Sequence, residues 1–274
     1  MPASPEKYVN SNDQFPRVQG GGSLILAWQI KNKHVLVVGG GEVAAGRILN
    51  VLNADAHVTV VCPSSGLNPE VRYRVANDEV THVDRVFNPS DLETLPPSNG
   101  PPDMVLVAVD DPAASTQIWK LCKQHRIPAN IADVPPECDF YFGSVHRDGP
   151  LQIMVSTNGK GPRLAASIRK WIGNQLPKGV GDAIERIGEL RAKLRQIAPS
   201  PEEGPKRMRW MTRVSDAYSW DEMCGFTDED MDNLLTFYPN NQVPHLDLLK
   251  GMRGGMSPED IDVFDGSFGF SVVA

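Results

Sequence analysis

The stretch that decides the fold is HVLVVGGGEVAAGRILNVL, residues 34–52, which is followed after a short turn by HVTVVC, residues 57–62. An unbroken apolar run such as residues 34–38 is typical of a strand that is buried on both faces. Residues 42–52 carry apolar side chains at near-helical spacing. The stretch therefore predicts one β-α-β unit, with a glycine cluster between its first strand and its helix.

The glycine cluster, residues 39–41, matches the pattern G-x-G-x-x-A at the opening of the predicted helix. Glycine permits a tight turn and a close backbone approach at this place. The helix N-terminus offers amide donors and positive potential to a pyrophosphate. We interpret the loop as an NAD-binding loop, and a plain tight turn is the alternative.

An acidic residue about 20 residues after the first glycine usually holds the adenosine ribose of the cofactor, and this sequence lacks one. Cys62 and Pro63 lie at that position. A ribose contact would therefore have to come from the backbone, from Cys62 or from the hydroxyls of Ser64 and Ser65. No arginine follows closely to bind a 2′-phosphate, which favours NAD over NADP.

Further strands and helices are expected in alternation along the chain. Short apolar runs predict strands at residues 23–30, 81–87, 104–109, 129–132, 140–145 and 151–156. Helical patterns lie at residues 113–125, 161–176, 180–198, 206–219 and 228–238. Strands that alternate with helices imply a parallel sheet, because a parallel connection needs a crossover.

The predicted fold class is α/β, with an N-terminal Rossmann-like parallel sheet, a small α+β dimerisation segment and a C-terminal helical domain. We expect a disordered N-terminus at residues 1–22, an NAD-binding domain at 23–145, a dimerisation segment at 146–200 and a helical domain with a loose tail at 201–274. An apolar stripe along residues 180–198 needs a partner surface. Either a subunit interface or the core of one subunit would supply it.

Composition and charge exclude several classes of protein. The chain has 274 residues, of which 41% are hydrophobic, and it contains no run of about 18 apolar residues such as a membrane span requires. The N-terminus carries no signal-peptide or transit-peptide pattern, which predicts a cytoplasmic protein. Four cysteines without a C-x-x-C pair and six scattered histidines predict neither a disulfide framework nor a resident metal. The net charge of −7 argues against a nucleic-acid partner.

Positive charge is nevertheless concentrated in one segment. Residues 160–213 hold 13 Lys and Arg against five Asp and Glu, a local balance of +8. Such a field would attract an anionic ligand, whether phosphates or a polycarboxylate. The alternative is a solvated helical face.

Asp133 is the candidate general base. It follows the strand predicted at residues 129–132, at the carboxyl edge of the sheet, where ligands of open α/β folds bind. A carboxylate there can take a proton from a substrate whose hydride leaves for a nicotinamide. The alternative is an aspartate that caps the turn before the two prolines that follow. Three other aspartates compete for the role: Asp110, Asp111 and Asp139.

With these features in place, the chain resembles the bifunctional precorrin-2 dehydrogenase/sirohydrochlorin ferrochelatase family of siroheme synthesis, in its stand-alone fungal form. Four blocks carry the resemblance in the family's order: VLVVGGGEVA (residues 35–44), NIADVPPECDFYFGS (130–144), LQIMVSTNGKGPRLAASIR (151–169) and IGELRAKLRQIAP (187–199). The second and third blocks are long and far more specific than a glycine pattern. The C-terminal quarter, after residue 205, matches the family poorly.

The resemblance implies an enzyme that oxidises precorrin-2 with NAD and then inserts ferrous iron into sirohydrochlorin. The family's catalytic aspartate falls on Asp133. Its dinucleotide contacts fall on Gly39, Gly40, Gly41, Glu42, Val43, Cys62 and Pro63. The family likewise lacks the usual ribose acid at the last two of these positions.

The resemblance also implies a homodimer built through the middle segment and a tetrapyrrole bound in a cleft between two domains. The residues that would line this cleft are Ser156, Thr157, Asn158, Gly159 and Arg163. An octacarboxylate substrate gives a physical reason for the +8 segment. Two rivals stay open: a dehydrogenase that has lost the chelatase activity, and a non-enzymatic NAD-binding regulator in which Asp133 is only a turn residue.

Overall fold

The structure is a computed structural model that describes residues 20–254. These residues divide into two units. The first unit contains residues 20–142 together with Asn158–Lys160, and the second contains Gly143–Thr157 and residues 161–254. The predicted disorder of the N-terminus and the predicted loose tail concern residues 1–19 and 255–274, which lie outside the described residues.

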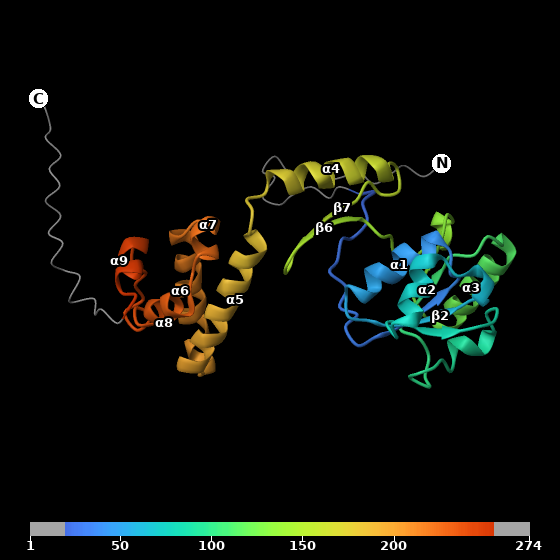
Figure 1. The fold of residues 1–274 in the computed structure, drawn as a ribbon, viewed down its shortest axis with the longest axis horizontal. Helices are drawn as coiled ribbons and strands as arrows, with labels where there is room; N and C mark the ends of the chain where they lie inside the picture. The colour runs from blue at the N-terminus through green and yellow to red at the C-terminus, as the bar shows by residue number, and fades with distance from the viewer. Residues whose placement is uncertain (1–19, 255–274) are drawn as a thin grey trace, which may run out of the picture. The chain divides into compact units, whose positions relative to one another are not determined.

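A sheet forms the centre of the first unit (Figure 1). It consists of five parallel strands in the order β3-β2-β1-β4-β5. The strands are β1 (His34–Val38), β2 (His57–Val61), β3 (Thr81–Val83), β4 (Met104–Val107) and β5 (Ala129–Ile131). The chain moves outward from β1 in one direction through β2 and β3, and in the other through β4 and β5. In sheets of this kind, ligands bind beside the carboxyl ends of the strands where the order reverses.

Helices cover both faces of the sheet, which explains the unbroken apolar run of β1. Val35 and Val37 pack in the same cluster as Ile48 of helix α1 (Glu42–Leu52). Leu36 and Val38 pack in a second cluster with residues of α3 (Pro112–His125). Every residue of β1 is buried, so the predicted strand and its burial on both faces are confirmed.

Three predicted strands differ in the structure, and the one expected at residues 81–87 ends at Val83. Residues 23–30 form no strand, and Leu24 is 82% exposed. A strand needs a hydrogen-bonded partner, and this segment pairs with neither edge strand of the sheet, β3 or β5. The strand expected at residues 140–145 begins only at Ser144. Before it, the ring of Phe140 packs edge-on against the rings of Trp28 and Phe142.

The second unit joins a small sheet to a group of helices. Strands β6 (Ser144–Asp148) and β7 (Leu151–Val155) pair antiparallel, and α4 (Pro162–Gln175) packs on them (Figure 1). The helices that follow are α5 (Val180–Ile197), α6 (Gly204–Ala217), α7 (Trp220–Cys224), α8 (Asp228–Leu235) and α9 (Leu246–Gly251). The expected α/β class with a helical C-terminal region is confirmed.

The apolar stripe on α5 is divided between two environments. Leu190 and Leu194 are fully buried in the core of the second unit, where they pack with Trp210 of α6. Ile184 and Ile197 at the two ends of the stripe are 40% and 57% exposed. The centre of the stripe therefore has its partner surface inside the same chain. Within residues 20–254, no helix is long and apolar enough to cross a membrane.

Candidate functional site

The glycine loop joins β1 to α1, and two of its glycines are required by packing. Gly39 has φ +112, and a Cβ atom on it would lie 2.1 Å from the carbonyl oxygen of Ala108. A Cβ on Gly40 would lie 2.7 Å from the Sγ of Cys62. The loop is therefore pressed between the residues that follow β4 and those that follow β2, and no side chain fits there.

Gly41 is different, because a Cβ added to it would meet nothing within 4 Å. It is the N-cap residue of α1, with an extended backbone and no side-chain capping bond. Glu42 and Val43 follow on the exposed side of the first turn. The backbone N–H groups of this turn and the positive end of the helix dipole thus face open space, an arrangement that fits a pyrophosphate.

The turn after β2 packs against the glycine loop. Cys62 is only 5% exposed, and burial raises the pKa of its thiol, so this residue is a packed, protonated cysteine. Pro63 is exposed and begins a short 3₁₀ turn, η1 (Ser64–Gly66). The N–H of Asn68 donates to the carbonyl of Gly40 at 2.7 Å. This bond ties the turn to the glycine loop.

Asp84, which the sequence did not indicate, lies beside this turn. It follows β3, and its Oδ1 accepts a hydrogen bond of 2.7 Å from the N–H of Ser64. Hydrogen bonds from Ser64 hold the pKa of Asp84 below its usual value. An exposed carboxylate is therefore present at this end of the sheet edge, although none is present in the turn after β2 itself.

Asp133 lies at the other end of the same edge, just after β5. Its side chain is exposed, and its backbone has φ +59, a left-handed conformation that aspartate adopts more readily than most residues with a Cβ. Among the described residues, no N–H group donates to its carboxylate. The alternative that Asp133 caps the turn before η3 (Pro135–Glu137) thus has no hydrogen bond to support it.

Arg47 links the glycine-loop helix to the strand ends near Asp133, and sequence reasoning missed it. Its Nη1 donates to the carbonyl of Val107 at 2.7 Å and to that of Asn130 at 3.3 Å. Burial lowers the pKa of Arg47, while the charges of Cys138 and Asp133 act in the opposite direction. The sequence shows only an arginine within the predicted helix, directly before the apolar Ile48.

Two of the competing aspartates have structural partners. The carboxylate of Asp111 accepts hydrogen bonds from the N–H groups of Ala113 and Ala114 and caps α3. The carboxylate of Asp139 accepts from the N–H of Ala129 at 2.9 Å and pairs with Lys123. These bonds account for both residues without a catalytic role.

The predicted tetrapyrrole-binding residues fall in both units. Asn158 and Gly159 belong to the first, where the side chain of Asn158 is hydrogen-bonded to Ser23 at 2.7 Å. Ser156, Thr157 and Arg163 belong to the second. The Oγ1 of Thr157 accepts from the N–H of Gly161, and Arg163 is exposed in the first turn of α4. No group of three or more His, Cys, Asp or Glu that could hold a metal ion occurs within residues 20–254.

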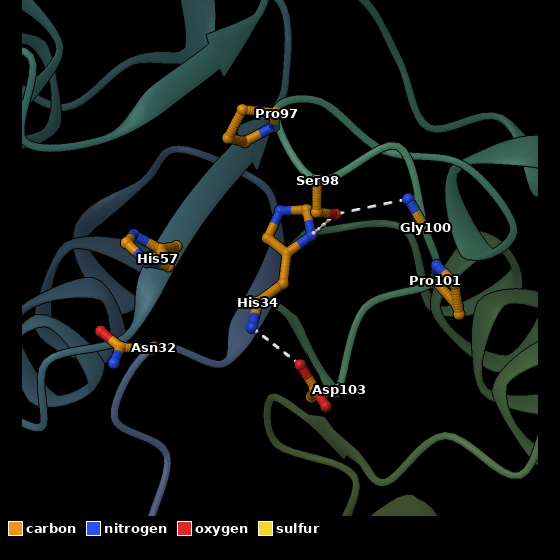
Figure 2. Close-up of a pocket in the computed structure, with 8 residues that line it drawn as sticks. All are labelled: Asn32, His34, His57, Pro97, Ser98, Gly100, Pro101 and Asp103. Carbon is orange, nitrogen blue, oxygen red and sulfur yellow. Dashed lines mark hydrogen bonds between the residues drawn. The ribbon is translucent and has the colours of Figure 1, made fainter.

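A cavity of about 320 Å³ lies at the opposite, amino edge of the sheet, beside His34 and His57, which begin β1 and β2 (Figure 2). The imidazole of His34 makes hydrogen bonds to Ser98 Oγ at 2.7 Å and to Thr59 Oγ1 at 2.9 Å. Thr59 in turn donates to the carbonyl of Pro96. Both ring nitrogens are satisfied within the protein, which indicates a structural network.

Comparison with known proteins bears on both units. Residues 26–144 match a family described as "Putative NAD(P)-binding". Residues 148–175 match the family "Sirohaem biosynthesis protein central", and residues 177–244 match "Sirohaem biosynthesis protein C-terminal". The last match corrects our expectation for the C-terminal quarter, because it extends well beyond residue 205.

Individual relatives agree with these matches. A siroheme biosynthesis protein of Schizosaccharomyces pombe is 52% identical over 226 residues, 82% of this chain and 83% of that protein. A siroheme biosynthesis protein of Saccharomyces cerevisiae is 31% identical over 228 residues, 72% of this chain and 83% of that protein. The solved structure of SirC, a precorrin-2 dehydrogenase, covers 80% of this chain and 100% of its own with a TM-score of 0.57 at 20% identity, and thus shares the fold.

The fold, the glycine loop and the match over residues 26–144 define an α/β protein with a dinucleotide-binding domain. The chain belongs to the family of siroheme biosynthesis proteins. The resemblance that the four sequence blocks indicated is confirmed.

Proposed function

We propose that this chain is an NAD-dependent precorrin-2 dehydrogenase that also inserts ferrous iron into sirohydrochlorin. One observation carries the proposal. The exposed carboxylate of Asp133 stands at the same sheet edge as the open helix N-terminus at Gly41, and Arg47 connects the two regions. The names of the relatives support the pathway, and that of the solved structure supports the first reaction.

The oxidation of precorrin-2 to sirohydrochlorin removes one hydride and one proton from the macrocycle. NAD supplies the hydride acceptor when it is bound. Gly39, Gly40 and Gly41 shape the loop that holds its pyrophosphate, Glu42 and Val43 begin the helix that faces it, and Cys62 and Pro63 form the neighbouring wall. Asp133 takes the proton, because its carboxylate is exposed and accepts no hydrogen bond from the described residues.

Arg47 acts as a positioning residue in this scheme. Its Nη1 binds the carbonyls of the last residue of β4 and the middle residue of β5, and this fixes the position of the two strand ends relative to α1. The loop that carries Asp133 begins directly after β5. The charge of Arg47 also lies close enough to Asp133 for the two groups to interact.

Iron insertion also needs a proton acceptor at the macrocycle. Ferrous iron is here a substrate, and two pyrrole N–H protons must leave as it enters sirohydrochlorin. A carboxylate that already served as proton acceptor in the oxidation can serve again once its proton has passed to solvent. We therefore assign both proton transfers to Asp133.

Basic side chains on α4 suit the eight carboxylates of the substrate. Arg163, Arg169 and Lys170 form no ion pair with any described residue, whereas Lys193 of the same +8 segment pairs with Asp232. Together with Ser156, Thr157, Asn158 and Gly159, Arg163 is assigned to tetrapyrrole binding. Unpaired cations attract a polyanion without first giving up a partner inside the protein.

A homodimer is part of the proposal. Helix α4 exposes Leu164, Ile168 and Trp171 on its surface, and Trp171 is 64% exposed. A row of large apolar side chains on one helix is typical of an interaction surface. Sedimentation equilibrium at micromolar concentration tests this point, and a single monomeric species would contradict it.

The test of the proposed reactions uses the purified chain with enzymatically made precorrin-2 under anaerobic conditions. We expect NADH to form together with sirohydrochlorin, and added ferrous iron to give siroheme faster than in a control without protein. NADH formation without faster iron insertion would show that the chain is a dehydrogenase without chelatase activity. NAD binding without either reaction would favour the regulator.

A further inference from the structure

The cofactor loop has a gap where the adenosine ribose is usually recognised. In open dinucleotide-binding folds, the strand that follows the first helix ends at an acidic residue that accepts hydrogen bonds from the ribose. Here that strand is β2, and it ends at Cys62 and Pro63. The Cys62 thiol is buried against Gly40, so no carboxylate comes from this strand.

The neighbouring strand, β3, is followed by a carboxylate at the level of the sheet where β2 ends. Strands β2 and β3 are parallel, with Val61 paired to Val83, so the residues that follow the two strands lie side by side. Asp84 is the first residue after β3, and its Oδ1 is 2.7 Å from the backbone nitrogen of Ser64. A carboxylate offers about four acceptor sites, so this exposed group retains capacity for further donors.

The turn that Asp84 holds also contacts the pyrophosphate loop. A Cβ atom on Gly40 would lie 3.1 Å from the carbonyl oxygen of Gly66, the last residue of η1. Asp84 and Asp133 therefore stand at opposite ends of one sheet edge, after β3 and after β5, with the glycine loop between them after β1. An extended dinucleotide whose nicotinamide lies toward Asp133 has its adenosine toward Asp84.

The charges around Asp84 favour an unphosphorylated ribose. Arg85, the adjacent residue, makes two hydrogen bonds, of 2.8 and 2.5 Å, to the carboxylate of Asp91, which is 1% exposed. Arg72 donates to the carbonyl of Leu67. The guanidinium of Arg85 is thus bound by the buried carboxylate of Asp91 and does not offer a free charge to a 2′-phosphate. A 2′-phosphate would bring about two negative charges next to the Asp84 carboxylate.

We propose that Asp84 is the ribose-recognising residue of this chain and that it selects NAD against NADP. The proposal rests on the proposed function, because it assumes that the glycine loop binds NAD. The two ribose hydroxyls donate to the carboxylate in NAD. In NADP one hydroxyl is replaced by an anion, so the same group repels the ligand, and discrimination comes from an unfavourable contact as well as from a favourable one.

Titration calorimetry of NAD and NADP on the full chain tests the proposal without any turnover. The variants are Asp84→Asn and, as a matched control, Asp78→Asn. Asp78 is an exposed aspartate shortly before the same strand, with a left-handed backbone that asparagine also adopts. Both changes remove one negative charge. Asparagine at position 84 can still accept the Ser64 N–H bond, so the turn is preserved.

For Asp84→Asn we expect the Kd of NAD to rise about tenfold and the Kd of NADP to fall at least about threefold, while Asp78→Asn changes neither beyond roughly a factor of two. Unchanged preference in Asp84→Asn would overturn the inference and leave the proposed function intact. An equal loss for both nucleotides would also overturn it, because it would show a structural role. If the wild-type chain bound neither nucleotide, the proposed function and the inference would fall together.

Discussion

The polar groups at the two edges of the five-stranded sheet are in opposite states. At the amino edge, His34 and Ser98 border a cavity, but both ring nitrogens of His34 have hydrogen-bond partners. At the carboxyl edge, Gly41 leaves a helix N-terminus open and Asp133 holds an exposed carboxylate on a left-handed backbone. The difference teaches that a cavity lined by a serine and a histidine does not by itself mark a site. Open donors and unpaired charge are the better signal.

The two edges differ in hydrogen bonding and not in backbone conformation. Left-handed backbone occurs at both edges, at Asp133 and at Asn32, which lines the amino-edge cavity. No described residue donates a hydrogen bond to the carboxylate of Asp133. At the amino edge, the N–H of His34 donates to Asp103, and Thr59 bonds both His34 and the carbonyl of Pro96. The hydrogen bonds of the amino edge therefore stabilise the fold.

The largest expected effect is at Asp133. We expect Asp133→Ala to lower both the oxidation of precorrin-2 and the insertion of iron by roughly 10²-fold or more, the usual contribution of general base catalysis. The Kd of NAD should stay close to that of the wild type. Initial rates and calorimetry on the same preparation measure both quantities.

Asp139→Ala is the control for that experiment, because the carboxylate of Asp139 already has Lys123 and the N–H of Ala129 as partners. Its effect on either rate should be milder. Near-normal rates in Asp133→Ala would refute the shared-base mechanism. Loss of one activity alone would show that the two reactions use different groups.

A smaller effect is expected at Arg47. Arg47→Gln removes the guanidinium nitrogen that binds Val107 and Asn130, so the end of β5 and the loop after it lose their fixed position. We expect kcat to fall about tenfold with little change in KM, since small displacements of a catalytic group are costly. Arg47→Lys, which keeps the charge but binds both carbonyls less well, should give an intermediate kcat. Identical behaviour of the two variants would contradict a positioning role.

At the amino edge we expect changes in stability alone. His34→Asn leaves Thr59 and Ser98 without their imidazole partner, which should lower the free energy of unfolding by about 1–3 kcal/mol. The Kd of NAD should not change. Urea unfolding and NAD titration distinguish the two edges, and a variant that kept its stability but lost NAD binding would reverse our assignment.

The pH dependence of stability gives the smallest effect. Burial lowers the pKa of His34 below 6.5, an effect that His57 reinforces and Asp103 opposes. As the pH falls, the unfolded chain therefore takes up this proton before the folded chain does. The contribution to stability is full above about pH 6.5 and decreases below it, so urea unfolding about one unit above and one below that value is the measurement. The free energy of unfolding should decrease more in the wild type than in His34→Asn when the pH is lowered. Equal decreases in the two proteins would contradict the role of His34.

The local features of the carboxyl edge could be predicted from the sequence. The apolar run before three glycines predicted β1, the loop and α1, and the strand–aspartate–proline order placed Asp133 at the strand ends. These predictions need only residues that are neighbours in the chain. The pattern asks for glycine at Gly39, where the backbone has a positive φ, but it leaves the next position open, so the close packing of Gly40 on Cys62 did not follow from it.

Residues brought together by tertiary pairing could not be predicted. Asp84 reaches Ser64 only because β3 pairs with β2, and Arg47 reaches Asn130 only because β5 is near α1 in space. The segment at residues 23–30 has the composition of a strand but pairs with neither edge strand of the sheet, and composition does not show which segments will pair. The stripe on α5 was ambiguous because periodicity does not tell whether the covering surface belongs to the same chain.

The most direct test of the central claim is NAD titration of a variant pair, one from each edge. A Cβ at Gly41 meets no atom within 4 Å, and an aspartate at this position can cap α1, so Gly41→Asp should be a few tenths of a kcal/mol more stable than the wild type. Its carboxylate would occupy the donors that the pyrophosphate needs. Gly41→Asn, which caps without a charge, should lose less affinity. Ser98→Ala removes a bond from the amino edge.

We predict that Gly41→Asp loses at least about 10²-fold in NAD affinity while it stays folded. Ser98→Ala should lose about 1 kcal/mol of stability and bind NAD as the wild type does. Normal NAD affinity in Gly41→Asp, or loss of NAD binding in Ser98→Ala, would contradict the assignment of the cofactor to the carboxyl edge.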